Sequence, residues 1–197
     1  MKLRQFLALA VSIVFQFSGI NAILFYSNQL FLDISGSVDD AVKKSMYLGI
    51  FQILVTIISG GLMDRFGRRS LMICGEIMVI SALLTGYYMV DFDKEGKWDP
   101  QYVTYAIFAH MAGYSLSMGS IAVVYMSEIV NDISPYMTFV WVETILISLT
   151  SNIMMEKFGI GKVFLFFAVI SMAGLAYIWK FMLETKGKTR QQVVNDF

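Results

Sequence analysis

The sequence contains little of several residue types, and each shortage excludes a class of function. Its 197 residues include one cysteine, one histidine and two prolines, and only 15% are charged. A single cysteine, Cys74, excludes an internal disulfide, and a single histidine, His110, is too isolated for a metal site. Fifteen basic residues balance fifteen acidic ones, so neither net charge nor a basic tract favours nucleic-acid binding.

The arrangements needed for covalent chemistry are also missing. We find no nucleophile–base pattern and no glycine-rich phosphate loop, so we expect neither enzymatic activity nor a cofactor or metal. The first apolar run lacks a short hydrophobic region followed by a small-residue cleavage site. It is therefore expected to stay in the membrane rather than to be removed as a signal peptide.

Apolar residues are what the sequence has in abundance. They make up 57% of the chain, and the mean hydropathy is +0.64. About 20 apolar residues cross the hydrocarbon core of a bilayer as a helix. Six candidate spans lie at roughly 5–32, 45–63, 70–90, 102–127, 134–155 and 161–183. The sequence thus predicts a single all-α membrane domain over residues 1–197, with a polar tail at 184–197.

The basic residues predict how this domain lies in the membrane. Six spans place both termini on one side, together with the second and fourth loops. That side holds nine of the Lys and Arg residues, and the other side holds six. The positive-inside rule then places both termini in the cytoplasm, or in the matrix of an organelle, while the choice of membrane stays open.

Four short motifs resemble those of the sugar porter family of the major facilitator superfamily. "DRFGRR" (64–69) resembles the loop motif of the superfamily, and "FQFSGINAILFYS" (15–27) resembles the seventh helix of the sugar porters. "YMSEIV" (125–130) and "LETKGKT" (183–189) resemble the motifs that end their tenth helix and follow their twelfth. The four occur in family order and at family spacing, and together they cover nearly the whole chain.

All four motifs belong to the carboxyl-terminal half of such a transporter, so the resemblance implies a six-helix half-transporter. A complete member needs twelve spans, or about 400 residues. The half itself is expected to consist of two inverted three-helix repeats. Gly19 and Gly119 are the expected weak points in the leading helix of each repeat.

The resemblance assigns the charged turn to a gating network at the inner face. Arg68 and Arg69 are expected to pair with Glu128 and Glu184, and Asp64 with Arg65 or a neighbour. Such ion pairs break when the two halves of a transporter rock apart, so they act as a latch. The plain alternative is that the arginines only orient the helices.

The resemblance also implies a substrate site for a hexose-like solute. Gln16 and Asn21 match the amides of the seventh helix that contact sugar, and Gln52 matches an amide of the eighth. Each amide offers a donor and an acceptor to hydroxyl groups, and Tyr26 is expected to add an aromatic wall. The alternative is that these amides only form hydrogen bonds to neighbouring helices.

Several family residues are replaced. The fourth span reads "SMGSIAVVYMSE" (117–128), with Ser120, Ala122 and Val123 where the family has two prolines and a tryptophan. Without prolines, this span is expected to lose its break and the hinge that goes with it. An ungapped match places Ile145 where the eleventh helix of the family has an asparagine. Half of the site is therefore expected to be missing.

Two acids, Glu76 and Glu143, lie inside predicted spans, where a carboxyl group is costly. Each is interpreted either as a proton-coupling group or, in preference, as an acid held at a helix interface. His110 is expected to form a hydrogen bond between helices.

Two functions therefore remain open. In the first, the chain joins a second half-transporter chain and moves a hexose-like solute by alternating access. In the second, it is a transport-inactive structural subunit of a larger membrane complex, for instance a respiratory assembly of an organelle. Both require the lipid bilayer and a protein partner, and neither involves nucleic acid.

Overall fold

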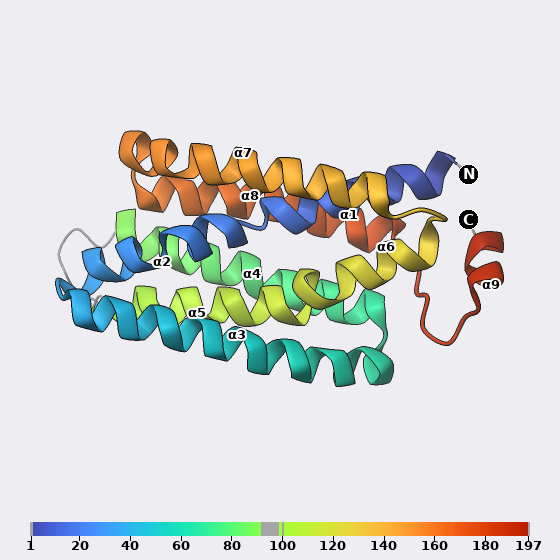
Figure 1. The fold of residues 1–197 in the computed structure, drawn as a ribbon, viewed down its shortest axis with the longest axis horizontal. Helices are drawn as coiled ribbons and strands as arrows, with labels where there is room; N and C mark the ends of the chain where they lie inside the picture. The colour runs from blue at the N-terminus through green and yellow to red at the C-terminus, as the bar shows by residue number, and fades with distance from the viewer. Residues whose placement is uncertain (1, 92–98, 100, 197) are drawn as a thin grey trace.

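In a computed structural model, the chain is a bundle of helices running along one long axis (Figure 1). Residues 2–91, 99 and 101–196 are described. The helices are α1 (Lys2–Phe17), α2 (Ile20–Ser35), α3 (Val38–Phe66), α4 (Arg68–Asp91), α5 (Gln101–Leu116), the π-helix η1 (Met118–Ala122), α6 (Val123–Ile129), α7 (Ser134–Phe158), α8 (Ile160–Phe181) and α9 (Arg190–Asn195).

Six segments of this bundle are long and apolar enough to cross a membrane. They cover residues 3–35, 38–66, 68–91, 101–129, 134–158 and 160–181. The first span combines α1 and α2, and the fourth combines α5, η1 and α6, while the other four are single helices. The expectation of an all-α protein with six membrane helices is confirmed.

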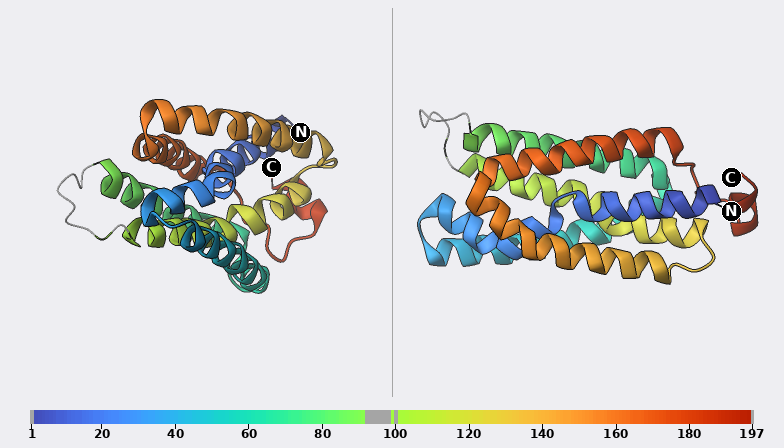
Figure 2. Two further views of the ribbon diagram at one scale, coloured as in Figure 1. Left: turned by 60° about the vertical axis from the view of Figure 1, so that its left-hand side comes forward. Right: turned by 90° about the horizontal axis from the view of Figure 1, so that it is seen from above.

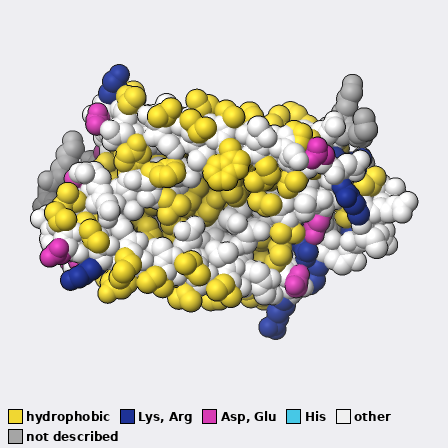
Figure 3. Space-filling view, in the orientation of Figure 1, with side chains coloured by type: hydrophobic (Ala, Val, Ile, Leu, Met, Phe, Trp, Pro, Cys, Tyr) yellow, Lys and Arg dark blue, Asp and Glu magenta, His cyan; other side chains and the backbone are white. Residues whose placement is uncertain are grey.

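The two ends of the bundle differ in what they carry. Both termini, α9 and the turn from α3 to α4 lie at one end, which we call the termini end (Figures 1 and 2). The turns from α2 to α3 and from α7 to α8 lie at the opposite end. Hydrophobic side chains cover the middle of the face drawn in Figure 3, and charged side chains gather toward the ends. This banding suits a bilayer between the two ends.

The first span is broken in its middle by Gly19. This residue has φ +85°, and a side chain added there would lie 3.0 Å from the Phe167 ring. Glycine is the residue that adopts this left-handed conformation without strain, so α1 ends at Phe17 and α2 begins at Ile20. The expected weak point at Gly19 is confirmed.

The fourth span is also irregular, although its prolines are absent. The π-helix η1 contains Gly119, the second expected weak point. The hydroxyl of Ser117 donates to the Gly113 carbonyl at 2.8 Å, and that of Ser120 donates to the Ser115 carbonyl at 2.7 Å. The expectation that this span loses its break is therefore wrong, because serine hydroxyls bond the carbonyls of an irregular turn.

The centre of the bundle depends on small residues. Helix α4 packs along both α5 and α8. A side chain added to Gly75 would lie 2.5 Å from the Gly113 carbonyl oxygen, and one added to Gly113 would lie 2.7 Å from that of Gly75. Paired small residues of this kind let membrane helices approach closely.

Two spans have little of their surface covered by the rest of the chain. Only 11% of the most apolar window of α3 is buried, and 22% of that of α7, against 61% for the first span. Ile57 of α3 and Leu149 of α7 are 68% and 67% exposed on these faces. Lipid or a further protein surface must therefore cover α3 and α7.

Candidate functional site

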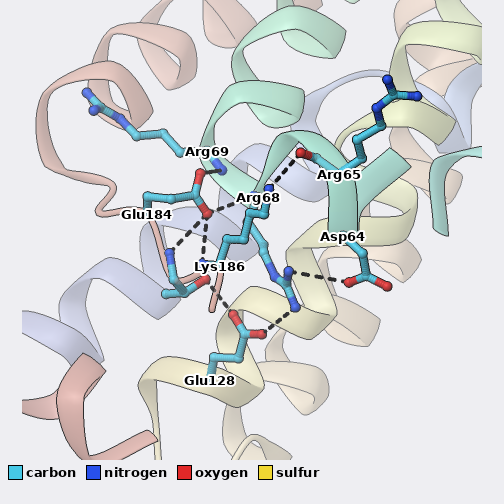
Figure 4. Close-up of polar contacts among 8 residues, drawn as sticks. Asp64, Arg65, Arg68, Arg69, Glu128, Glu184 and Lys186 are labelled. Carbon is cyan, nitrogen blue, oxygen red and sulfur yellow. Dashed lines mark hydrogen bonds and ion pairs between the residues drawn. The ribbon is translucent and has the colours of Figure 1, made fainter. Parts of the chain in front are cut away.

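The charged turn of the sequence lies within a polar cluster at the termini end (Figure 4). The guanidinium of Arg68 is 3.0 Å from Glu128 Oε1 and 3.6 Å from Asp64 Oδ1. Its side chain is only 14% exposed, so water screens the pair with Glu128 less than it would at an open surface. One arginine thus connects α3, α4 and α6.

Glu184 is held by the backbone of α4 rather than by an arginine side chain. Its Oε1 accepts the N–H of Arg68 at 2.9 Å, and its Oε2 accepts the N–H of Arg69 at 3.0 Å. The first N–H groups of a helix have no partner within the helix and carry partial positive charge, so a carboxylate there is favourable. Glu184 therefore caps α4 from a distant part of the sequence.

Gly67 makes this cap possible. Its φ is +90°, and a side chain added there would lie 2.5 Å from Glu184 Oε2. A larger residue would be strained at this φ and would also displace the carboxylate. The short turn between α3 and α4 is thus shaped to receive Glu184.

Two further members of the cluster were not anticipated as site residues. The Thr185 hydroxyl donates to Glu128 Oε2 at 2.6 Å, and Lys186 Nζ donates to the Arg65 carbonyl at 2.6 Å. Both lie in the "LETKGKT" motif, in which the sequence predicts only Glu184 as a site residue. The unused signal was the pair of polar residues directly after that acid.

The other two arginines lie differently from the expected pairing. Arg69 donates from its guanidinium to the Trp179 carbonyl at 2.7 Å and reaches Glu184 only through its N–H. Arg65 lies over the Phe66 ring, and Asp64 pairs with its neighbour Arg68, one of the partners expected for it. Arg68 is thus the central cation of the cluster.

The expected substrate amides lie at the break in the first span. Gln16 is buried, and its Nε2 donates to the Val140 carbonyl at 2.9 Å and to the Thr144 hydroxyl at 2.5 Å. Its Oε1 accepts a hydrogen bond from the Asn21 side chain. Gln16 and Asn21 therefore form one polar group with α7. Thr144 was missed because the ungapped match pointed to Ile145, which is exposed on the outer face.

Tyr26 and Gln52 lie outside this group. The Tyr26 hydroxyl donates to the Ser148 carbonyl of α7 at 2.9 Å. Gln52 is half-buried on α3, and no hydrogen-bond partner for it is found in the described part of the chain. The structure thus joins Gln16 directly with Asn21. Tyr26 lies farther along the contact with α7, and Gln52 lies apart from this group on α3.

His110 links the two broken spans. Its Nε2 is 2.8 Å from the Ser18 carbonyl oxygen. The break at Gly19 leaves that carbonyl without a helical N–H, and the described backbone bonds supply no other donor. The expectation of an interhelical hydrogen bond from His110 is confirmed.

The two intramembrane acids are both buried. Glu76 is fully buried on α4 and faces Ser171 of α8. Glu143 is 4% exposed on α7, one residue before Thr144, and its Oε2 has no hydrogen-bond partner in the described part of the chain. Neither acid faces a basic side chain within ion-pair distance among the described residues.

Comparison with known sequences identifies relatives over nearly the whole chain. The model of the family described as "Sugar (and other) transporter" matches residues 1–197. The facilitated trehalose transporter Tret1 of Aedes aegypti is 28% identical over 187 residues, which are 90% of this chain and 23% of the relative. Trehalose transporter 1 of Drosophila melanogaster is 29% identical over 201 residues, covering 95% of this chain and 23% of the relative. The chain therefore spans about a quarter of the length of these relatives.

Solved structures share the fold. The inward-open xylose transporter XylE from E. coli matches 97% of this chain and 41% of its own, with a TM-score of 0.80 and 22% identity. XylE bound to 6-bromo-6-deoxy-D-glucose matches 98% of this chain and 43% of its own, with a TM-score of 0.79 and 20% identity.

Proposed function

Because the chain belongs to the sugar transporter family, we propose that its six spans form one half of a unit that moves a hexose-like solute by alternating access. Its fold is half of a major facilitator arrangement, with two inverted three-helix repeats. The family carries solutes and is not a family of enzymes. The second half belongs to the same or to another polypeptide, and the termini end faces the cytoplasm or matrix.

The observation that carries this proposal is the polar group formed by Gln16, Asn21 and Thr144. It lies in the middle of the first span, where polar side chains are costly and mark solute pathways. The break at Gly19 lies between the two amides. Discontinuous helices at the midplane are the places where transporters bind their substrates.

The open faces of α3 and α7 support the need for a second half. They are the least buried spans, and both pack against the first span, which carries Gln16 and Asn21. A second six-helix half on these faces would enclose the amides between two surfaces. The Arg68–Glu128 pair would then break and form again as the halves rock.

A test of transport uses Gln16→Ala and Asn21→Ala in vesicles that carry the chain in its native assembly. Both variants should lose uptake of radiolabelled D-glucose and trehalose, because each removes an amide from the proposed site. Gln5→Ala is the matched control, since Gln5 is exposed on the same helix far from the break. Uptake that survives both substitutions would remove these amides from the proposal.

A second candidate function is that of a transport-inactive structural subunit of a larger membrane complex. Two observations favour it. Ser120, Ala122 and Val123 replace the prolines and tryptophan of the resembled motif, and every polar atom of the Gln16 amide group contacts the chain itself. The native mass and composition after gentle extraction distinguish the two. Two halves and little else would support transport, and many unrelated subunits at fixed ratio would support the structural function.

A further inference from the structure

A cavity of about 540 Å³ lies between α2 and α7 at the end opposite the termini. Its polar lining comes from Tyr26, Gln29 and Asp33 of α2 and from Asn152 and Glu156 of α7. Cavities of about 300–1,000 Å³ are the usual size for small-molecule sites. The cavity is separate from the arginine cluster, which lies at the other end of the bundle.

The two helices present the same pair of groups to this cavity. Gln29 Nε2 donates to Asp33 Oδ1 at 2.9 Å, and Asn152 Nδ2 donates to Glu156 Oε1 at 2.7 Å. Each pair leaves an amide oxygen and a carboxylate oxygen as acceptors. The lining is therefore rich in acceptors, and it suits a ligand that presents several hydroxyl donors. The Tyr26 ring adds an apolar wall.

A line of polar residues joins this cavity to the amides at the break. Thr144, Ser148, Asn152 and Glu156 follow one another at intervals of four residues, so they share one face of α7. Thr144 bonds Gln16 at one end of the line, and the Ser148 carbonyl bonds Tyr26 in its middle. A helix end that was merely solvated would have no need of polar residues continuing to the midplane.

We propose that this cavity is a second binding site for polyhydroxy solutes, which receives a sugar before it reaches Gln16 and Asn21. The inference rests on the proposed transport function. Asp33 and Glu156 would accept hydroxyl hydrogens, with Gln29 and Asn152 fixing the carboxylates. The Thr144–Glu156 face of α7 then leads from the outer cavity to the midplane amides.

The first test measures binding without transport. Met155, which lines the cavity, is changed to Cys in a Cys74→Ser background, and a membrane-impermeant maleimide labels it in the native assembly. D-glucose or trehalose should slow labelling relative to an equal osmolarity of potassium chloride. Lys43→Cys, exposed at the same end outside the cavity, is the control and should label equally with and without sugar.

The second test assigns the binding to the carboxylates. Asp33→Asn combined with Glu156→Gln should weaken protection of Cys at 155 about tenfold or more, because hydrogen bonds to charged groups are the strong ones. Asp39→Asn, an exposed acid at the same end, is the matched control and should leave protection unchanged. Equal labelling with and without sugar, or protection that survives the double variant, would overturn the inference.

The two proposals fail separately. Gln16→Ala should abolish uptake while sugar still protects position 155. Uptake by the unmodified chain without any protection would overturn the cavity site alone. Protection without uptake would overturn the transport function alone, and the loss of both would overturn both.

Discussion

The carboxylate of Glu184 lies across the first turn of α4 and accepts the backbone N–H of Arg68 at 2.9 Å. The two residues are separated by 116 positions in the sequence. The same Arg68 extends its side chain to Glu128 on α6. Arg68 therefore binds one carboxylate through its backbone N–H and another through its guanidinium. These two contacts hold the termini end of the bundle together.

Because Gly67 lies against Glu184, adding one methyl group at position 67 should strongly lower the stability of the fold. Gly67→Ala should destabilise the chain by at least about 2 kcal/mol, because it strains φ +90° and contacts Glu184 at 2.5 Å. Thermal unfolding in nanodiscs measures this. Gly61→Ala is the control, since Gly61 is helical with open space around it, and it should be neutral or stabilising by up to about 1 kcal/mol. An unchanged melting temperature for Gly67→Ala would contradict the proposed cap.

The Arg68–Glu128 pair should show measurable coupling. In a double-mutant cycle with Arg68→Gln and Glu128→Gln, we expect a coupling energy of about 1–3 kcal/mol, since the Arg68 side chain is largely buried. The more exposed Asp40–Lys44 pair on α3 is the control, and its coupling should be under about 0.5 kcal/mol. Charge reversal at both Arg68 and Glu128 should rescue reversal at either alone. Additive single effects would show that the two residues act independently.

Loss of His110 should destabilise the break in the first span. His110→Leu keeps an apolar volume but leaves the Ser18 carbonyl without its donor, which should cost about 1–3 kcal/mol. Thr104→Val on the same helix is the control. The buried Thr104 hydroxyl has no hydrogen-bond partner in the described part of the chain, so its removal should be neutral or stabilising. A His110→Leu variant as stable as Thr104→Val would contradict a stabilising His110–Ser18 hydrogen bond.

The start of α7 should weaken in acid. Hydrogen bonds from the side chain and backbone N–H of Ser134 hold the pKa of Asp132 below its ordinary value of 3.8. Because the folded pKa is the lower one, this contribution is present above about pH 3.8 and is lost as pH falls through the folded pKa. The stability difference between the wild type and Asp132→Asn should therefore shrink on acidification. A difference that stays constant from neutral to acid pH would contradict a stabilising Asp132–Ser134 hydrogen bond.

The spans and the charged turn could be predicted from the sequence because their signals are local. Apolar length fixes a membrane helix, and glycines such as Gly19 mark where one must break. The motif around Arg68 also pointed to its partners Glu128 and Glu184, although the mode of contact with Glu184 is through the backbone. Whether this cluster gates transport stays a prediction.

The parts that could not be predicted depend on three-dimensional neighbours. Thr144 contacts Gln16 because it lies on the inner face of α7, whereas the next residue, Ile145, is exposed on the outer face. The irregular turn at η1 is supported by serine hydroxyls, which carry no sequence signal comparable to proline. The cavity forms where α2 packs against α7, and no sequence motif within either helix predicts this contact.

Synthesis proceeds from the amino terminus, so the Glu184 cap forms only after α4 has been made. Arg68 and Glu128 are made well before Glu184, Thr185 and Lys186, which follow the sixth span. Until then, the first N–H groups of α4 have no acid to receive them. The termini end can therefore reach its final arrangement only after the sixth span has been synthesised, so α4 is made well before the acid that caps it.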